Sequence, residues 1–358
     1  MQGGQAVGES LGLGSTLLIF REVNNMRILF RQDQFDRMRN LTLAAIFLLV
    51  ASVAATAQDP TSHPPKPAPK PMLDIRLSEG RDGRDTAPQD APVSDKWATV
   101  YGVKIHYLEA GSGPVVMLLH GLGGDVSNWA PTIAPLSQKH RVIVPDQIGF
   151  GKSDKPLINY RVATLVDFLD GFYKQVGVTK ASLVGNSLGG WTVAAYALAH
   201  PEKVDRLVLV DAAGFAVTGD LDPRVLNGLN PSTRDAIKQV MGLVFYNKEL
   251  FASDAAVDAL FARKMAAGDG YTIQRFIDSI THGEDVLDKK LSAVKQPTLI
   301  VWGREDGLTP LAMGERFNKE IAGSQLLVIE KCGHVPQLEK SAEFNAALMK
   351  FLGAGMNK

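Results

Sequence analysis

The amino-acid sequence predicts an α/β fold, a mostly parallel β-sheet covered by helices on both faces. From about residue 96 onward, short apolar runs alternate with longer helix-like segments, which is the pattern of repeated β-α-β units. The short runs are almost wholly apolar, as expected for strands buried on both faces of a parallel sheet. Of the 358 residues, 45% are hydrophobic, which is enough for a sizeable core.

The individual elements follow from this alternation. An antiparallel hairpin is expected at 97–109, with Gly102 in its turn. Buried strands are predicted at 115–119, 141–144, 181–184, 206–210, 298–302 and 325–329. Helices that connect them are predicted at 162–175, 187–200, 311–322 and 341–351. Such crossovers place helices on both faces of the sheet.

Strand signals disappear between residues 214 and 290, where helical patterns are interrupted by Pro231, Gly242 and the segment 268–270. We interpret this region as an inserted helical lid, with 268–270 as either a hinge or a loop. Its apolar side chains either line a hydrophobic substrate channel or pack the lid against the core, and packing is the commoner meaning of such periodicity. They are Met241, Leu243, Val244, Phe245, Phe251, Leu260, Phe261 and Met265.

The N-terminal part of the chain has the layout of a secretory signal peptide at residues 38–57. Arg39 precedes an apolar run at 41–53, and Ala55-Thr56-Ala57 forms an A-x-A exit after it. We therefore expect export to the periplasm or the extracellular space, with cleavage after Ala57. The run is short for a membrane span, so no stable span is expected after cleavage. The alternative is an uncleaved anchor.

Two further segments complete the expected domain organisation. Residues 1–37 precede the signal peptide, and we interpret them as an upstream extension, with the true start at Met38. Residues 58–95 are rich in Pro, Asp and Lys and poor in apolar side chains, which is typical of an extended linker. One compact domain is expected at 96–352.

Charge and cysteine content exclude several classes of partner. The chain has 38 basic and 38 acidic residues, so its balance favours neither nucleic acid nor an anionic membrane surface. Its one cysteine, Cys332, cannot form an internal disulfide and has no ligand cluster around it for zinc. We expect no metal and no organic cofactor, and the sequence leaves the oligomeric state open.

The most informative motif is Gly185-Asn186-Ser187-Leu188-Gly189, which has the form G-x-S-x-G. It joins the predicted strand at 181–184 to the predicted helix at 187–200. A serine on such a strand-to-helix turn is a nucleophile elbow, in which side chains in place of the glycines would collide with the backbone. Ser187 is therefore the candidate nucleophile.

A serine nucleophile needs a base that takes its proton and an acid that orients this base. Asp306 follows the predicted strand at 298–302, and His334 follows the next strand at 325–329. Catalytic groups converge at the carboxyl ends of parallel strands, so both can meet Ser187. Asp211 also follows a strand and is an alternative acid.

In this order of serine, acid and histidine the chain resembles the α/β-hydrolase superfamily over about residues 96–352. His120-Gly121-Leu122-Gly123-Gly124 stands where the family carries its oxyanion-hole loop, and 146–153 looks like the family's D-x-x-G-x-G-x-S turn. The resemblance implies an α/β-hydrolase fold with an inserted helical lid at about 214–290. It also implies that Ser187 attacks, His334 shuttles the proton and Asp306 fixes the imidazole tautomer.

The resemblance further implies that the backbone N–H groups of Leu122 and Leu188 form the oxyanion hole. The segment 120–129 and the GNSLGG elbow look most like bacterial esterases and lipases of the monoacylglycerol-lipase-like branch. The expected function is thus cleavage of hydrophobic carboxylic esters through an acyl-enzyme. Alternatives on the same triad are a carbon–carbon hydrolase of meta-cleavage products and a cofactor-free perhydrolase; a ligand-binding protein without activity is the non-enzymatic alternative.

For the carbon–carbon hydrolase, two features of the chain bear on the choice. Such relatives often have tryptophan after the catalytic histidine, where this chain has Val335. They also place an arginine in the lid for a substrate carboxylate. Here the candidates are Arg224, Arg234, Arg263 and Arg275.

Overall fold

A computed structural model describes residues 92–216, 226 and 228–354. The predicted upstream extension at 1–37, the signal peptide at 38–57 and most of the linker at 58–95 lie outside the described residues. So does part of the predicted lid, at 217–225 and 227. None of the helices within the described ranges is both long and apolar enough to span a membrane.

The fold is built on one sheet of eight strands in the order β1-β2-β4-β3-β5-β6-β7-β8. The strands are β1 (Ser94–Val100), β2 (Val103–Ala110), β3 (Val115–Leu119), β4 (Arg141–Pro145), β5 (Ala181–Asn186), β6 (Val204–Val210), β7 (Thr298–Gly303) and β8 (Gln325–Ile329). Strand β2 is antiparallel to β1 and β4, and every other pair is parallel. The predicted α/β class is confirmed, and each predicted strand lies within two residues of an observed one.

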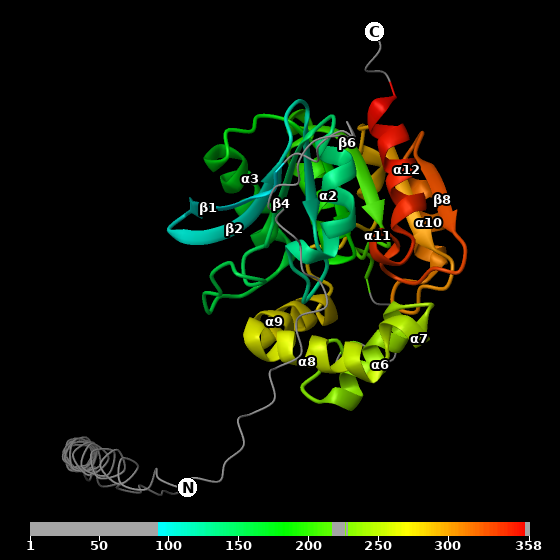
Figure 1. Ribbon diagram of the computed structural model, residues 1–358. Helices are drawn as coiled ribbons and strands as arrows, with labels where there is room; N and C mark the ends of the chain where they lie inside the picture. Colours follow the sequence, from blue (N-terminus) through cyan, green and yellow to red (C-terminus); the bar gives the residue numbers. More distant parts are fainter. Residues whose placement is uncertain (1–91, 217–225, 227, 355–358) are drawn as a thin grey trace, which may run out of the picture. The chain divides into compact units, whose positions relative to one another are not determined.

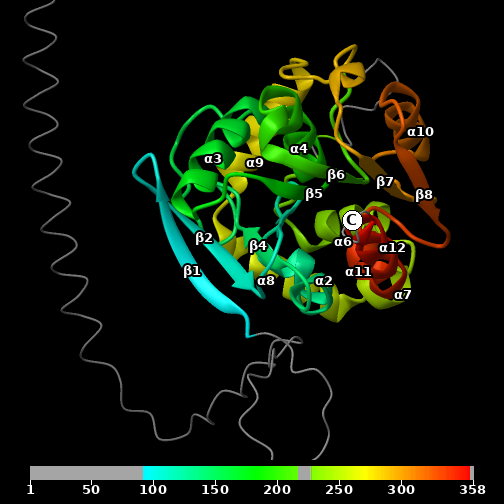
Figure 2. The same ribbon diagram turned by 90° about the horizontal axis from the view of Figure 1, so that it is seen from above.

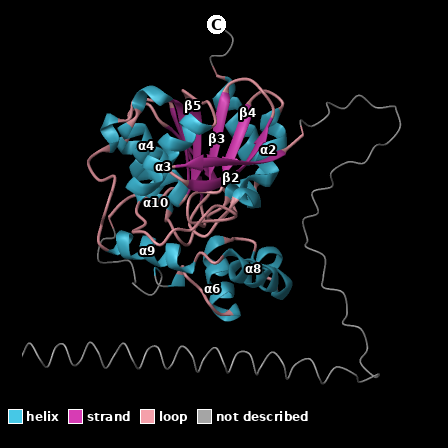
Figure 3. Ribbon diagram, turned by 90° about the vertical axis from the view of Figure 1, so that its left-hand side faces the viewer, coloured by secondary structure: helices cyan, strands magenta, loops and turns pink. Residues whose placement is uncertain are grey.

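Alternation along the strands sends side chains into two apolar cores. On β3, Met117 and Leu119 belong to one core, and Val116 and Leu118 belong to the other. The first core is covered by α3 (Val162–Gln175), α4 (Leu188–Ala199) and α10 (Leu311–Glu320), and the second by α2 (Ala130–Ser137) and α12 (Ser341–Gly353). Figure 2 shows these helices on opposite sides of the sheet, and Figure 3 shows α3 and α4 on one side and α2 on the other. Strands buried on both faces explain the almost wholly apolar runs.

Helix α2 was not predicted from the sequence. It contains Pro131 in its first turn and Pro135 further along, and a proline inside a segment normally argues against a helix. Burial of Ile133 and Leu136 against the second core stabilises the helix despite this penalty. The remaining short helical turns are η1 (Val126–Trp129), η2 (Pro201–Lys203), η3 (Leu291–Ala293) and α11 (Pro336–Glu339).

The segment interpreted as a lid contains α6 (Arg234–Val244), α7 (Lys248–Phe251), α8 (Asp254–Ala267) and α9 (Gly270–Thr281). Figure 1 shows these helices together at one end of the sheet. Gly268 ends α8 in the left-handed conformation, with φ of 62°, so 268–270 is a helix cap and the start of α9. The carbonyls of Leu243 and Val244, at the end of α6, accept the N–H groups of Gly307 and His334. The lid is thereby tied to the loops after β7 and β8.

Candidate active site

The predicted site residues lie at the carboxyl ends of four strands of the sheet. Leu122 follows β3, Ser187 follows β5, Asp306 follows β7 and His334 follows β8. The chain leaves β3 toward β4 on one side and leaves β5 toward β6 on the other. The gap between β3 and β5 is therefore the topological switch point, where open α/β sheets form their binding crevice.

Ser187 occupies a sharp turn with φ of 55° and ψ of −118°, a region that a serine adopts only under strain. The backbone holds it there, because its N–H donates to Val210 and its carbonyl accepts the N–H of Ala213. Both glycines of the motif are required because other backbone atoms approach them too closely for a side chain. A Cβ on Gly185 would lie 2.2 Å from the Gly189 carbonyl oxygen, and one on Gly189 would lie 2.3 Å from that of Leu119.

The acid and the histidine are brought together directly. His334 Nδ1 lies 2.7 Å from Asp306 Oδ2, and both residues are buried. The backbone N–H groups of Leu308 and Thr309 donate to Asp306 Oδ1, and the Thr309 hydroxyl donates to Oδ2. Because Nδ1 is occupied by Asp306, the other imidazole nitrogen, Nε2, is free to act as the base.

Asn186 connects the elbow to the histidine loop. Its Nδ2 donates to the carbonyl oxygens of His334, at 3.0 Å, and Val210, at 3.1 Å. Ser187 and His334 line the same cavity. The side chain that precedes the nucleophile thus links the two loops by a hydrogen bond, a role that the sequence pattern did not specify.

Asp306 is held in its ionised form. Burial alone would raise its pKa, but the charge and hydrogen bond of His334, together with the Thr309 and Leu308 donors, outweigh burial and lower the pKa below its usual value. An ionised Asp306 can accept Nδ1–H and stabilise the imidazolium that forms when His334 takes a proton.

Asp211, the alternative acid, lies fully buried beside this pair. Its Oδ1 accepts the Gly303 N–H at 2.9 Å, whereas Oδ2 has no hydrogen-bond partner within the described part of the chain. Burial and the neighbouring charge of Asp306 raise the pKa of Asp211 well above its usual value. The hydrogen bond to His334 is made by Asp306. Asp211 is a second carboxyl buried beside this pair, and its raised pKa favours the protonated form.

We expect Asp211→Asn to stabilise the fold increasingly as pH rises. A carboxyl with a raised pKa in the fold stays protonated there, whereas in the unfolded chain it ionises above about pH 3.9. The wild type therefore loses stability above that pH, by up to about 1.4 kcal/mol per pH unit, and the neutral amide does not. Urea unfolding at pH 4, 5.5 and 7 measures the difference. A difference that does not change with pH would show that Asp211 is ionised in the fold.

Donor atoms of Asp211, Asp306 and His334 all lie within 4.8 Å of one another, a spacing that could hold a cation. The same atoms have other uses here. Asp306 Oδ2 already accepts from Thr309 and contacts His334 Nδ1, and a protonated Asp211 is a poor ligand because ligands bind deprotonated. We assign the cluster to orientation of His334.

The loop after β3 forms the wall that faces the nucleophile. A Cβ on Gly121 would lie 3.1 Å from the Ser187 Cβ, so this loop packs directly against the elbow. Leu188 is the first residue of α4, where an N–H has no partner inside the helix. Leu122 and Leu188 both line the cavity with Ser187. His120 lies behind the loop, with Nδ1 near the Gly121 carbonyl oxygen and Nε2 accepting the Gln147 N–H.

The D-x-x-G-x-G-x-S turn at 146–153 is hydrogen-bonded to the segment that follows that loop. Asp146 accepts the N–H of Val126, at the start of η1, and the N–H of Lys152. A Cβ on Gly151 would lie 2.2 Å from the Asp146 carboxyl carbon, which explains the glycine. The buried His106 Nδ1 lies 2.7 Å from Asp146 Oδ2. No motif in the sequence pointed to His106, because its partner is 40 residues away.

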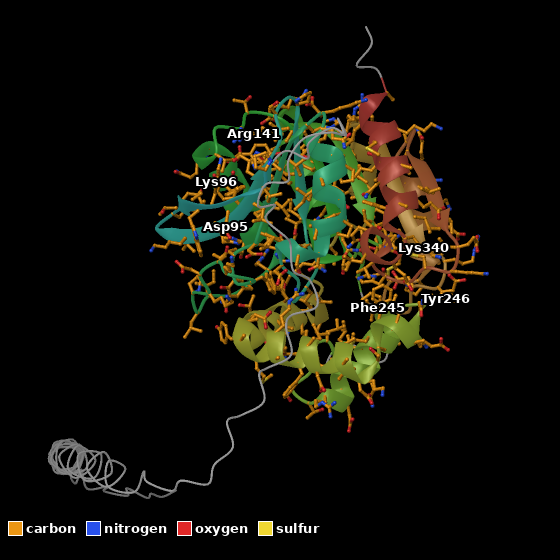
Figure 4. All side chains as sticks on the ribbon, in the orientation of Figure 1. Asp95, Lys96, Arg141, Phe245, Tyr246 and Lys340 are labelled. Atoms are coloured by element: carbon orange, nitrogen blue, oxygen red, sulfur yellow. The ribbon has the colours of Figure 1, made fainter. Side chains whose placement is uncertain are left out.

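A cavity of about 400 Å³ opens between these loops and the lid. Its wall is mostly apolar and includes four of the eight lid side chains named from the sequence: Met241, Val244, Phe245 and Leu260. Figure 4 places Phe245 at the junction between lid and core. Of the others, Leu243 and Phe251 line a separate hollow, Phe261 packs with α6 and α8, and Met265 is 53% exposed.

Among the candidate lid arginines, Arg263 on α8 lines the cavity. Its guanidinium lies 2.8 Å from Asp125 Oδ2. Arg234 and Arg275 pair with Asp258 and Asp278, and Arg224 lies outside the described residues. Lys264 also lines the cavity, and its Nζ lies 2.8 Å from the buried Asp269. Each described cation on the cavity wall therefore has a carboxylate partner.

A serine on a strained elbow and a buried aspartate–histidine pair, which share one cavity, form the arrangement expected of a serine hydrolase. The family model described as alpha/beta hydrolase fold matches residues 114–341. The chain belongs to the alpha/beta hydrolase fold family, and it is a hydrolase by that membership.

Similar proteins differ in the substrates that their names give. The 2-hydroxymuconate semialdehyde hydrolase of Pseudomonas sp. (strain CF600) is 32% identical over 279 residues, which cover 74% of this chain and 96% of the relative. The meta-cleavage product hydrolase of Pseudomonas fluorescens IP01 superposes with a TM-score of 0.66 at 30% identity, over 72% of this chain and 97% of that one. A bacterial membrane phospholipase A superposes with a TM-score of 0.67 at 28% identity, over 74% and 87%. The curated relatives agree better with the carbon–carbon hydrolase than with the expected ester hydrolase.

Proposed function

We propose that this protein is a serine hydrolase that cleaves uncharged carboxylic esters with an apolar acyl chain. The observation that carries the proposal is the wall of the cavity around Ser187. It is mostly apolar, and the cations among its described residues, Arg263 and Lys264, are each engaged by a carboxylate. The described part of the wall therefore binds an acyl chain favourably and offers no free positive charge to an anionic substrate.

In the proposed reaction Ser187 Oγ attacks the ester carbonyl carbon while His334 Nε2 takes the hydroxyl proton. The N–H groups of Leu122 and Leu188 stabilise the oxyanion. The protonated His334 then donates its proton to the leaving alcohol, and an acyl-enzyme forms on Ser187. Water, deprotonated by His334, attacks the acyl carbonyl and releases the acid. Asp306 keeps the imidazole in its orientation throughout and stabilises the positive charge that forms on it.

The second candidate is hydrolysis of a carbon–carbon bond in a meta-cleavage product. Two observations favour it: the names and full-length similarity of the curated relatives, and the position of a lid arginine, Arg263, on the cavity wall. The relatives support this candidate more directly than the ester. The pairing of Arg263 with Asp125 and Val335 in place of tryptophan are the reasons to place the ester first.

The test is the rate of hydrolysis of p-nitrophenyl esters from acetate to palmitate by the full chain, with Ser187→Ala as the matched control. We expect kcat/KM to peak at an intermediate acyl length set by the cavity. The variant is expected to lose at least about 10⁴-fold in kcat, as serine nucleophiles do when removed.

A 2-hydroxy-6-oxo-dienoate serves as the competing substrate in the same experiment. Turnover of the dienoate with a kcat/KM above that of every ester, also abolished in Ser187→Ala, would replace the ester proposal by the carbon–carbon hydrolase. Ester turnover that persists in Ser187→Ala would contradict the assignment of the nucleophile.

We also propose that the protein acts outside the cytoplasm, after removal of residues up to Ala57. The proposal is supported by the charged, apolar and A-x-A segments at 38–57. Mass spectrometry of the N-terminal peptide of the native protein tests it. A mature chain beginning at Gln58 is the expected result, and an intact peptide upstream of Met38 in the native protein would contradict it.

A further inference from the structure

The pair formed by Asp125 and Arg263 joins the oxyanion-hole loop to the lid across the cavity wall. Asp125 immediately precedes η1, and Arg263 lies on α8. The Asp125 Oδ2 to Arg263 Nη2 distance is 2.8 Å, and Arg263 Nη1 donates to the Ser127 hydroxyl at 3.2 Å. Both partners line the cavity of Ser187, so their charges face the substrate.

The charges on the described part of the wall cancel. Apart from His334, they are two cations, Arg263 and Lys264, and two carboxylates, Asp125 and Asp269. Lys264 and Asp269 form the more buried pair, with side chains 13% and 2% exposed. The side chain of Arg263 is 39% exposed and that of Asp125 is 23% exposed. Arg263 is therefore the cation that a substrate reaches more easily.

A substrate carboxylate that approached Arg263 would find its guanidinium already paired with Asp125. It would have to displace Asp125 from the guanidinium or remain close to a second negative charge, and like charges in a partly desolvated site repel each other. An uncharged acyl chain has neither problem. The cost to an anionic substrate thus comes from one carboxylate, although the cavity contains a cation.

We propose that Asp125 is the specificity-determining residue of this site: by neutralising Arg263, it makes the Ser187 cavity select uncharged substrates over substrates that bear a remote carboxylate. This inference deepens the proposed ester hydrolysis and depends on it. It explains how a lid arginine can lie in the cavity of an enzyme for neutral esters. Specificity of this kind is set by a repulsive element as much as by attractive contacts.

The structure allows Asp125 to be tested without loss of its structural role. Its Oδ1 accepts the Ser127 N–H at 2.8 Å and so caps η1, while Asn128 caps the Asp125 N–H in return. Asparagine is as good a cap as aspartate, so Asp125→Asn can keep the cap through its one amide oxygen, while the charged acceptor for Arg263 is replaced by an amide N–H₂ group. Arg263→Met removes the cation while keeping an unbranched apolar stem.

The experiment compares p-nitrophenyl hexanoate with mono-p-nitrophenyl glutarate, which are similar in length and differ in a terminal carboxylate. We expect wild type to prefer the hexanoate, and Asp125→Asn to lower the hexanoate-to-glutarate ratio of kcat/KM at least about 10-fold, equivalent to about 1.4 kcal/mol. The change should shrink at high salt. In Asp125→Asn/Arg263→Met the ratio should return toward the wild-type value, because the unpaired cation is removed and Lys264 stays paired with Asp269.

An unchanged ratio in Asp125→Asn would overturn the inference, since a pair that merely ties the lid to the loop changes both esters together. An equal change in the double variant would overturn it as well. If neither ester is hydrolysed, the proposed function fails, and the inference is judged separately. The same ratio is then taken from the rates at which a neutral and a carboxylate-bearing alkylphosphonate p-nitrophenyl ester label Ser187.

Discussion

Replacing Asp306 with asparagine is expected to lower kcat for ester hydrolysis by about 10⁴-fold, the effect seen when a triad acid loses its charge. Asparagine cannot stabilise the imidazolium of His334. Its amide can also donate to Nδ1, which would leave the proton on Nε2, the atom that must accept from Ser187. The measurement is kcat between pH 5 and 10 with the best p-nitrophenyl ester.

The buried Asp211 provides the control for this prediction. The charge of Asp306 is one cause of the raised pKa of Asp211, so its removal lets Asp211 ionise more readily beside His334. We expect Asp306→Asn to retain a residual activity that rises with pH and that Asp306→Asn/Asp211→Asn lacks. A loss of less than about 10-fold in Asp306→Asn, set against the precedent for triad acids, would contradict the assignment of Asp306 as the acid.

The second large effect is expected at Gly189, where alanine should destabilise the fold by about 3 kcal/mol or more, at the upper end of overpacking costs. A Cβ there would lie 2.3 Å from the Leu119 carbonyl oxygen and 2.6 Å from that of His120. These atoms belong to the backbone of the central sheet and of the predicted oxyanion-hole loop, so neither can move without disturbing the site. Urea unfolding measures the free energy of unfolding. The rate of ester turnover shows whether the elbow still positions Ser187 for reaction.

Gly242→Ala is the matched control for this substitution. Gly242 lies inside α6, and a Cβ there meets no atom within 4 Å. Alanine is preferred to glycine in a helix by about 0.8–1 kcal/mol, so we expect this variant to be more stable than wild type. A Gly189→Ala variant as stable as wild type would show that the elbow has room that the structure does not show.

The sheet could be predicted from the sequence because its strands are continuous apolar runs. The runs at 115–119 and 325–329 have the same limits as β3 and β8, and fold class follows from such patterns. Helix α2 could not be predicted, because Pro131 and Pro135 argue against a helix locally while the packing that stabilises it is tertiary. A helix that is stabilised mainly by tertiary packing is hard to predict from its own sequence.

The three triad candidates could be predicted from the sequence, but the residues that surround them in the fold could not. Ser187, Asp306 and His334 each follow an apolar run in a recognisable motif. The approach of the buried Asp211 to Asp306, the hydrogen bond from Asn186 to His334 and the Asp125–Arg263 pair each join residues that are far apart in the chain. Asn186 and His334 are 148 positions apart. Pairings of this kind depend on the three-dimensional approach of loops. The catalytic roles themselves stay predictions until they are measured.

The most direct test of the serine hydrolase assignment is labelling by a fluorophosphonate probe followed by mass spectrometry of the modified peptide. We expect one adduct, on Ser187, that is absent from Ser187→Ala and forms much more slowly in Asp306→Asn, because the probe reacts only with a serine activated by its histidine. An adduct on another residue, or no adduct on the folded wild-type protein, would contradict the nucleophile, the triad and the proposed function together.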